Sequence, residues 1–288
     1  MRAGMLNAPA ADEAAQVPSG KRRGVSSGND GSGGRVVLGT RGVSKSFGAV
    51  QALKDVDFEV RSGEVVALIG DNGAGKSTFI NAITGVFPPD TGEITFEGEP
   101  VRFESPHDAR ERGIETVYQD LAVAPQLDAV GNIFLGRERY RPGILGRLGL
   151  LDGARMRRET EEQLADLNVR IRDLNKPLST FSGGQRQGVA VARAVMWASK
   201  VVIMDEPTAA LGVAQVEMVL DLIRRVRDTG IPVVFISHNM PHVFDVADRI
   251  CVLRLGELVA ELDTKNNTTD DAVAAMTGAV RSREGGAQ

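Results

Sequence analysis

The sequence predicts an α/β fold in which a core of buried strands and helices is joined by an antiparallel β layer and an inserted α-helical lobe. Three observations carry this prediction. Uniformly apolar runs such as residues 65–69 alternate with stretches of helical periodicity, as in parallel sheets that are covered on both faces. Runs of alternating character fill the first third of the chain, which is typical of antiparallel strands. Between about residues 128 and 182 the pattern is helical.

The predicted elements can be placed in chain order. Strands of the first third are expected at residues 36–38, 57–60, 65–69, 92–96 and 101–103. Ser105 followed by Pro106 predicts the start of a short helix, because serine caps helices and proline suits their first position. Residues 157–164 predict a charged, solvent-facing helix. The α/β pattern then returns, with strands at residues 201–204 and 232–236 and a helix face formed by Val216, Val219, Leu220, Ile223 and Val226.

Length and composition are those of an ordinary soluble globular protein. The 288 residues, 42% of them hydrophobic, can bury one large core or two lobes. A net charge of −4 argues against a surface that neutralises a nucleic-acid backbone, so we expect no nucleic-acid partner. The one cysteine, Cys251, lies in an apolar run, where we expect a core residue and no disulfide. No apolar run is long enough to span a bilayer, so we expect a cytoplasmic protein.

A single domain is expected at residues 35–280, with the helical lobe at about residues 128–182. Residues 1–34 are rich in Gly, Ala, Ser, Asn and Pro and cannot bury enough apolar surface to order themselves, so they predict a disordered tail. Residues 281–288 predict a second tail. The basic triplet at residues 21–23 could contact anionic lipid, but three charges are a weak membrane signal, so a solvated tail is the favoured interpretation.

A glycine-rich loop follows the strand at residues 65–69 and opens the next helix. It matches the pattern GxxxxGK[ST] and consists of Gly70, Asp71, Asn72, Gly73, Ala74, Gly75, Lys76, Ser77 and Thr78. Glycines let the backbone fold around phosphates, so that its N–H groups and the helix N-terminus face the negative charge. Lys76 would reach the outer phosphates, and the Ser77 hydroxyl would bind Mg²⁺. We therefore expect a P-loop core that binds a nucleoside triphosphate.

Two carboxylates follow a predicted buried strand. Asp205 and Glu206 come after the apolar run at residues 201–204, and the carboxyl edge of a parallel sheet is where α/β proteins bind ligands. One carboxylate suits a metal ion and the next suits a water molecule. A solvated acidic turn is the alternative for any single pair of this kind. The phosphate-loop pattern in the same chain favours the functional interpretation.

The run Ser182-Gly183-Gly184-Gln185 resembles the signature motif of ATP-binding cassette (ABC) ATPases. The other motifs stand in the order of that family: Phe47 at the place of an adenine-stacking aromatic residue, Gln119 in the Q-loop, Asp205 and Glu206 in the second Walker motif, and His238 in the H-loop. Any one of these residues alone would be interpreted as an ordinary surface or core residue. Five ordered motifs over about residues 36–262 make the resemblance specific.

A finer resemblance is to the cassettes of bacterial monosaccharide importers of the ribose, xylose and fructose type. It rests on residues 118–121, 132–138, 206–211 and 237–240. The familiar ribose-type ATPase carries two fused cassettes, whereas this chain has one and no internal repeat. The D-loop departs from the wider family, because Gly212 stands where an aspartate is usual, and this leaves open how tightly two sites of a dimer are coupled.

The resemblance implies a homodimer or paired cassette that encloses two ATP molecules. Signature residues 182–185 of one chain would cover the γ-phosphate held by the other. Lys76 and His238 would stabilise charge on that phosphate, and Glu206 would act as general base. Mg²⁺ would be held by Ser77, Gln119 and Asp205. The implied partners are transmembrane permease subunits and, indirectly, a periplasmic substrate-binding protein, which would place the chain on the cytoplasmic face of the inner membrane.

Two other functions are compatible with parts of the sequence. A non-transport ABC ATPase acting in a cytosolic process is the main alternative. Ribosome-associated relatives generally carry two cassettes with a charged linker, and DNA-repair relatives split the motifs with a long coiled coil; this sequence has neither feature. A nucleotide-binding regulator that does not hydrolyse ATP is disfavoured, because Glu206 and His238 are both present.

Overall fold

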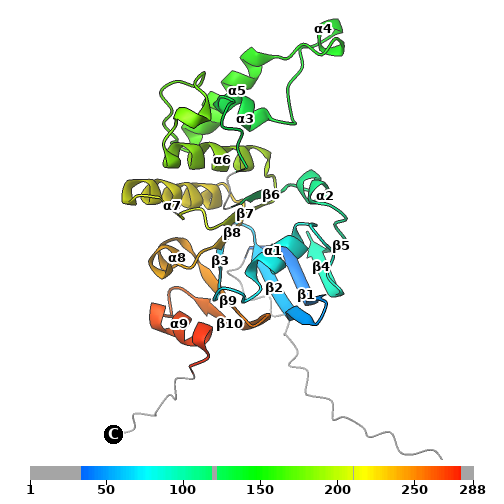
Figure 1. Ribbon diagram of the computed structural model, residues 1–288, viewed down its shortest axis with the longest axis vertical. Helices are drawn as coiled ribbons and strands as arrows, with labels where there is room; N and C mark the ends of the chain where they lie inside the picture. The colour runs from blue at the N-terminus through cyan, green and yellow to red at the C-terminus, as the bar shows by residue number, and fades with distance from the viewer. Residues whose placement is uncertain (1–33, 119–121, 210, 280–288) are drawn as a thin grey trace, which may run out of the picture. The chain divides into compact units, whose positions relative to one another are not determined.

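The computed structural model describes residues 34–118, 122–209 and 211–279 of the chain. The predicted tails, apart from Gly34, and the Q-loop residue Gln119 lie outside these ranges. Figure 1 shows two sheets and a set of helices, and strands and helices alternate along the chain. The predicted α/β class is confirmed.

The buried apolar strands form a six-stranded sheet in the order β10-β9-β3-β8-β7-β6. The strands from β9 to β6 are parallel to their neighbours, and β10 runs antiparallel to β9. Their bounds are β3 (Val65–Ile69), β6 (Ile114–Val117), β7 (Val201–Asp205), β8 (Val233–Ile236), β9 (Arg249–Arg254) and β10 (Glu257–Asp263). Because β3, β8 and β7 are parallel neighbours, their carboxyl ends meet at one edge of the sheet.

Side chains of this sheet alternate between two hydrophobic cores. Val65, Ala67 and Ile69 of β3 face the core that most of the helices complete, whereas Val66 and Leu68 face the core beneath the antiparallel sheet. Burial on both faces explains why the strand is apolar at every position. Cys251 lies in the second core, as expected, and burial raises the pKa of its thiol to about 12.

The first third of the chain forms a four-stranded antiparallel sheet in the order β2-β1-β4-β5. Its strands are β1 (Val36–Phe47), β2 (Val50–Arg61), β4 (Thr91–Phe96) and β5 (Glu99–Val101). The strand predicted at residues 101–103 is wrong in position, because β5 ends at Val101. Phe103 is buried in the second core, so its apolar character reflects packing and not strand pairing.

Helices cover the six-stranded sheet and continue beyond it. Their bounds are α1 (Lys76–Ile83), α2 (Pro106–Glu111), α3 (Ala129–Phe134), α4 (Ile144–Arg147), α5 (Gly153–Asp166), α6 (Gly183–Trp197), α7 (Val213–Asp228), α8 (Met240–Val246) and α9 (Thr269–Thr277), with a 3₁₀ turn at Leu178–Thr180. The predicted start of α2 is confirmed: the Ser105 hydroxyl accepts from the Asp108 N–H in a capping box, and proline occupies the first turn.

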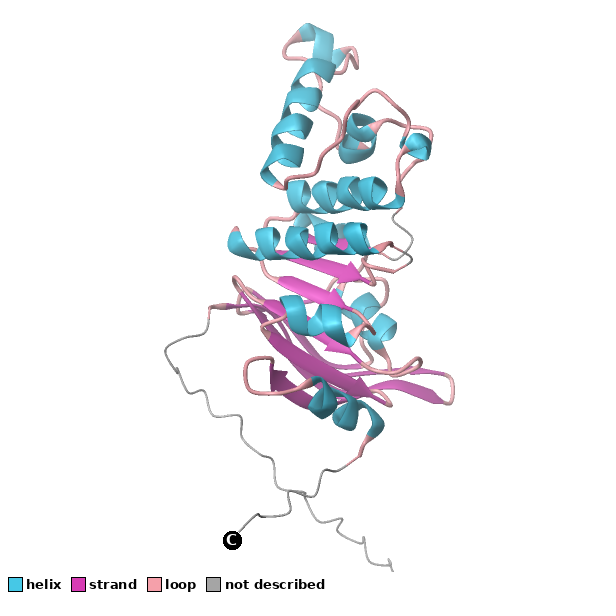
Figure 2. Cartoon of the chain, turned by 90° about the vertical axis from the view of Figure 1, so that its left-hand side faces the viewer, coloured by secondary structure: helices cyan, strands magenta, loops and turns pink. Residues whose placement is uncertain are grey.

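Helices α3 to α6 lie between β6 and β7 in the chain and stack away from the sheet (Figure 2). In this helical region α6 packs against α7 on one side and against α3 and α5 on the other. Phe134 of α3 meets Trp197 of α6 edge to face, with ring centroids 5.6 Å apart. The helices of the described residues are all too short or too polar to span a bilayer.

Candidate functional site

The glycine-rich loop joins the carboxyl end of β3 to the first residue of α1, as predicted. All three of its glycines have positive φ, with +155° at Gly70 and +108° at Gly75. A Cβ atom at Gly70 would lie 2.2 Å from the Leu253 carbonyl oxygen, and one at Gly75 would lie 2.7 Å from that of Ala52. Both positions therefore need glycine, because the loop runs against neighbouring backbone. Packing against Ala52 and Leu253 holds the loop at the sheet edge.

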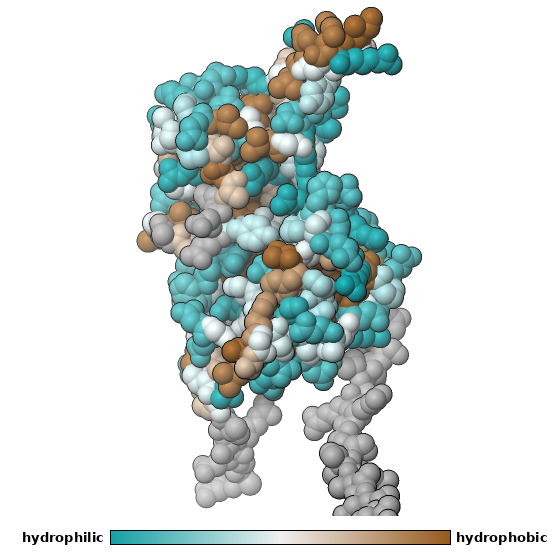
Figure 3. Space-filling view, turned by 45° about the vertical axis from the view of Figure 1, so that its right-hand side comes forward, coloured by the Kyte–Doolittle hydropathy of each residue, from teal (hydrophilic) through white to brown (hydrophobic). Residues whose placement is uncertain are grey.

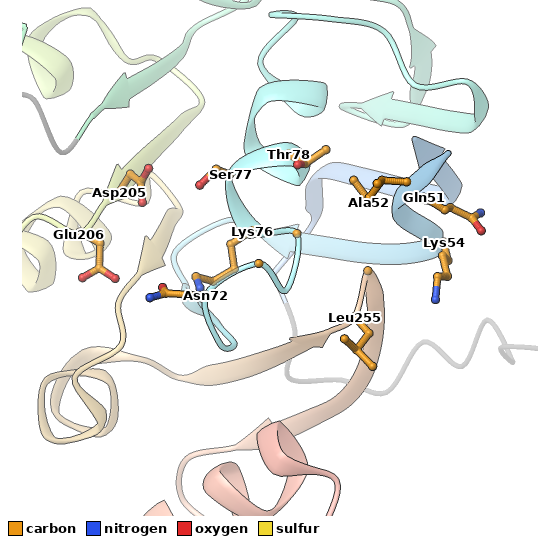
Figure 4. A pocket seen from close by; sticks show the side chains of 14 residues that line it. Gln51, Ala52, Lys54, Asn72, Lys76, Ser77, Thr78, Asp205, Glu206 and Leu255 are labelled. Atoms are coloured by element: carbon orange, nitrogen blue, oxygen red, sulfur yellow. The ribbon is translucent and has the colours of Figure 1, made fainter. Parts of the chain in front are cut away.

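A cavity of about 570 Å³ opens over this loop. Figure 4 shows Lys76 and Ser77 of the loop and helix on one wall, with Asp205 and Glu206 from the end of β7 facing them. The predicted residues that line it are Asn72, Gly73, Gly75, Lys76, Ser77, Thr78, Asp205 and Glu206. Gly70, Asp71 and Ala74 belong to the same loop but do not line the cavity. The volume falls within the range of typical small-molecule sites.

The Lys76 ammonium is bound by the loop itself. Its Nζ donates to the carbonyl oxygen of Gly70 at 2.7 Å and to that of Asp71 at 3.1 Å. Lys76 is also the first residue of α1, where the helix dipole and free N–H groups favour negative charge. An ammonium group, backbone N–H groups and a helix N-terminus thus converge on one wall of the cavity. This arrangement suits a phosphate chain.

Asp205 and Glu206 stand at the carboxyl end of β7 and differ in environment. Burial raises the pKa of Asp205, the nearby Glu206 charge raises it further, and the Lys76 charge lowers it. The Asp205 carboxylate and the Ser77 hydroxyl line the same cavity and are hard oxygen donors of the kind that Mg²⁺ prefers. Among the described residues, no three His, Cys, Asp or Glu side chains gather into a metal-binding group.

Glu206 is held in an unusual backbone conformation. Its φ is +49°, which is rare for a residue with a side chain, and its N–H donates to the Ile236 carbonyl oxygen of β8 at 2.9 Å. Its Oε1 lies 2.8 Å from Nδ1 of His238, which follows the end of β8. The Glu206 side chain is 15% exposed and that of His238 is 74% exposed. The structure thus brings together two residues that are 32 positions apart and were both predicted to be catalytic.

The signature residues lie elsewhere, at the start of α6. Ser182 is the N-cap, and its hydroxyl accepts from the Gln185 N–H at 3.3 Å, while the Gln185 side chain accepts from the Ser182 N–H at 3.0 Å. Residues 182–185 do not line the cavity. Ser182 is exposed, so the motif presents a capped helix start to solvent.

Phe47 also lies outside the cavity wall. It ends β1, is 49% exposed, and packs edge to face on Phe87 with ring centroids 5.3 Å apart. Only three positions later, Val50 of the same hairpin lines the cavity. The aromatic ring therefore stands beside the cavity and is partly free to meet a ligand that extends from it.

The sequence analysis missed the wall opposite the carboxylates. That wall consists of residues from β2 and from the turn between β9 and β10: Val50, Gln51, Ala52, Lys54, Leu255 and Gly256. The Lys54 N–H donates to the Gly256 carbonyl oxygen at 2.8 Å, and the Gly256 N–H donates to that of Ala74 at 2.9 Å. These bonds join segments about 200 positions apart, and no local sequence pattern marks them.

The chain is similar to known proteins over most of its length. A family model described as ABC transporter matches residues 53–209. The fructose import ATP-binding protein of Rhizobium meliloti is 54% identical over 245 residues, which cover 84% of this chain and 94% of that protein. The xylose/arabinose import ATP-binding protein of Sulfolobus acidocaldarius is 46% identical over 241 residues, with the same two coverages.

A solved structure shows a similar fold over most of the chain. It is a dimeric ATP-binding cassette in a post-hydrolysis state with ADP and phosphate bound. The two chains superpose with a TM-score of 0.67 and 27% sequence identity, over 80% of this chain and all of that one. With a family match over more than half of its residues and relatives of this identity, the chain belongs to the ABC transporter family as an ATP-binding cassette.

Proposed function

We propose that this chain is the ATP-hydrolysing subunit of a bacterial ABC importer for a monosaccharide. The hydrogen bond between Glu206 and His238 at the rim of the phosphate-loop cavity is the observation that carries the hydrolytic part of this proposal. The relatives named as fructose and xylose/arabinose import proteins support the substrate class. The matched residues cover 94% of each of these two relatives.

ATP would bind with its phosphates over the glycine loop. Lys76 would exchange the carbonyl oxygens of Gly70 and Asp71 for oxygens of the outer phosphates, a stronger pairing because both groups are charged. The adenine would extend toward Phe47, past Val50. Ser77 and Asp205, together with Gln119, would hold Mg²⁺. The chemistry that Mg²⁺ would supply there is positive charge that offsets the negative charge of the phosphates.

Glu206 would act as the general base for the attacking water. A general base must lie within hydrogen-bond reach of the water and must be held in place. The backbone bond to Ile236 and the side-chain bond to His238 supply this positioning. His238 is mostly exposed, so it can also turn toward the γ-phosphate when a nucleotide enters.

A second cassette would complete the site. Ser182 to Gln185 stand outside the cavity of their own chain, so the proposed contact of residues 182–185 with a γ-phosphate requires another protomer. The dimeric state of the solved relative supports such a pairing. Closure and reopening of the pair would drive a transmembrane permease, fed by a periplasmic substrate-binding protein, from the cytoplasmic face of the inner membrane.

Uptake measurements test the proposal. Cells that lack this gene should lose uptake of one labelled monosaccharide among ribose, xylose, arabinose and fructose, and the wild-type chain should restore it. Glu206→Gln should not restore uptake, although the protein is made in equal amount. Normal uptake of all four sugars in the deletion strain would instead favour the non-transport ATPase. Uptake restored by Glu206→Gln would favour a regulator without hydrolysis.

A further inference from the structure

A short segment between α3 and α5 stands apart from the rest of the helical region. We call residues 139–151 the tip segment. Its stem is held by backbone bonds from the Arg141 N–H to the Leu150 carbonyl at 2.9 Å and from the Asp152 N–H to the Arg139 carbonyl at 2.7 Å. The single turn of α4 lies between the two arms of this stem and is closed by further backbone hydrogen bonds. The tip segment is therefore ordered by its own backbone.

Close packing of the turn against the stem supports this order. A Cβ atom at Gly146 would lie 1.9 Å from the Arg141 carbonyl oxygen, so the turn sits directly against the stem. Gly143 and Gly149, on either side of α4, have φ of +72° and +80°. These glycines allow a compact loop that does not need a hydrophobic core of its own.

The apolar side chains of the tip segment point outward. None of the residues of α4 is buried, and Ile144 and Leu148 are 75% and 70% exposed. The exposed large apolar side chains of the segment are Tyr140, Ile144, Leu145, Leu148, Leu150 and Leu151. Figure 3 shows hydrophobic side chains gathered over the α4 end of the helical region. A cluster of this kind on a protein surface marks a site where another protein or a membrane binds.

The charge of the tip segment is entirely basic. It contains Arg139, Arg141 and Arg147 and no aspartate or glutamate, although the whole chain carries a net charge of −4. Arg139 pairs with Glu159 of α5, whereas Arg141 and Arg147 are exposed, and no carboxylate of the described residues lies within ion-pair distance of either. A second tip segment would repel this one. The charge thus favours an anionic occupant.

We propose that the tip segment inserts into the surface of a membrane that contains anionic lipids. Exposed leucine and isoleucine would enter the boundary between headgroups and acyl chains, Tyr140 would lie at headgroup depth, and Arg141 and Arg147 would contact phosphates. The shape also favours lipid, since the apolar residues project from a one-turn helix and line neither the cavity over the glycine loop nor the one at the end of α5. A fluid surface accommodates such a projection without a matching groove.

Flotation of the full-length chain with lipid vesicles tests the proposal. Vesicles of phosphatidylcholine alone are compared with vesicles containing about 30% phosphatidylglycerol, an anionic lipid. Wild type should float with the anionic vesicles and less with the neutral ones. Ile144→Asp with Leu148→Asp should lower the bound fraction by about tenfold or more, because two inserted side chains become charged. Arg141→Glu with Arg147→Glu should lower it at least about fivefold, and only on anionic vesicles.

Matched variants control for unspecific effects. Val259→Asp with Val273→Asp changes two exposed apolar residues of β10 and α9, and Arg102→Glu with Arg225→Glu makes the same charge change away from the tip. Both should float like wild type. All variants keep residues 21–23, so unchanged flotation of the tip variants would assign membrane binding to that basic triplet and overturn the proposal. Failure of wild type to float with anionic vesicles would overturn the proposal. If the tip variants then also failed to bind the permease, the tip segment would be assigned to a protein partner.

Discussion

The cavity at the edge of the six-stranded sheet and the start of α6 differ in how completely one chain builds them. The cavity is walled on both sides, and Glu206 of its wall already contacts a second predicted catalytic residue, His238, at 2.8 Å. The start of α6 is a finished local structure, because Ser182 and Gln185 satisfy each other, yet it faces solvent. Parallel strands bring distant residues to one edge, whereas a helix start can offer only its own first turn. The first region is suited to hold a nucleotide, and the second is suited to be brought to one.

Glu206→Gln should break the chemistry of the cavity with the largest effect. ATP turnover should fall by roughly two to four orders of magnitude, because glutamine keeps the size of the side chain but cannot accept a proton. ATP affinity should remain within about twofold, since Lys76 and the loop are unchanged. Steady-state phosphate release and a nucleotide titration measure the two quantities. Glu111→Gln, on exposed α2, serves as the control, and wild-type turnover by Glu206→Gln would refute the assignment.

Ser182→Asp should impair dimer formation at the start of α6 without changing the cavity of its own chain. Aspartate caps a helix as well as serine does, so α6 should keep its stability, while the added negative charge would repel the γ-phosphate held by a second chain. In the Glu206→Gln background with ATP and Mg²⁺, the dissociation constant of the dimer should increase on the order of a hundredfold. Light scattering after size-exclusion chromatography measures it. Ser105→Asp at the cap of α2 is the matched control, and an unchanged dimer in Ser182→Asp would contradict a site shared by two chains.

Lys76→Ala should weaken nucleotide binding without unfolding the chain. The ammonium contacts only loop carbonyl oxygens among the described residues, so its loss leaves both hydrophobic cores intact. ATP affinity should fall about 10- to 100-fold, the expected loss for charge-assisted hydrogen bonds. A titration that includes the exposed Lys265→Ala as control measures this change. Equal affinities of both variants, with both folded, would remove Lys76 from the site.

Asp205→Asn should give the smallest of the four effects, a slight gain in thermal stability. Burial raises the pKa of Asp205 above its ordinary value, so the native state binds its proton more readily than the unfolded state does. The carboxylate therefore destabilises the nucleotide-free protein at neutral pH, and this penalty disappears as pH falls through the raised pKa. Asparagine should raise Tm by about 1–3 °C at pH 7 and by less near pH 4. Glu217→Gln, on the exposed face of α7, should leave Tm unchanged at both pH values. A lower Tm for Asp205→Asn would contradict the desolvation argument.

Local patterns were sufficient wherever the relevant physics is local. Strand β3, the glycine loop and the start of α1 follow from apolar periodicity and glycine chemistry, and the cap at Ser105 follows from one side chain and one proline. The order of motifs then identified the ABC family, which the family match confirms. Phe103 marks the limit of this approach, because an apolar residue near a strand can be buried by packing alone.

The sequence by itself determined the type of the elements around the phosphate loop, the loop itself and the family to which the chain belongs. Only the tertiary structure decided that β2 and the turn at Leu255 form the second wall of the cavity, that Glu206 meets His238, and that the apolar residues of α4 remain exposed. The reason is that neighbours along the chain share one backbone periodicity, whereas contacts between β2, β7, β8 and β9 depend on strand order. Strand order follows from packing of the two cores as a whole, and no short stretch of sequence contains it.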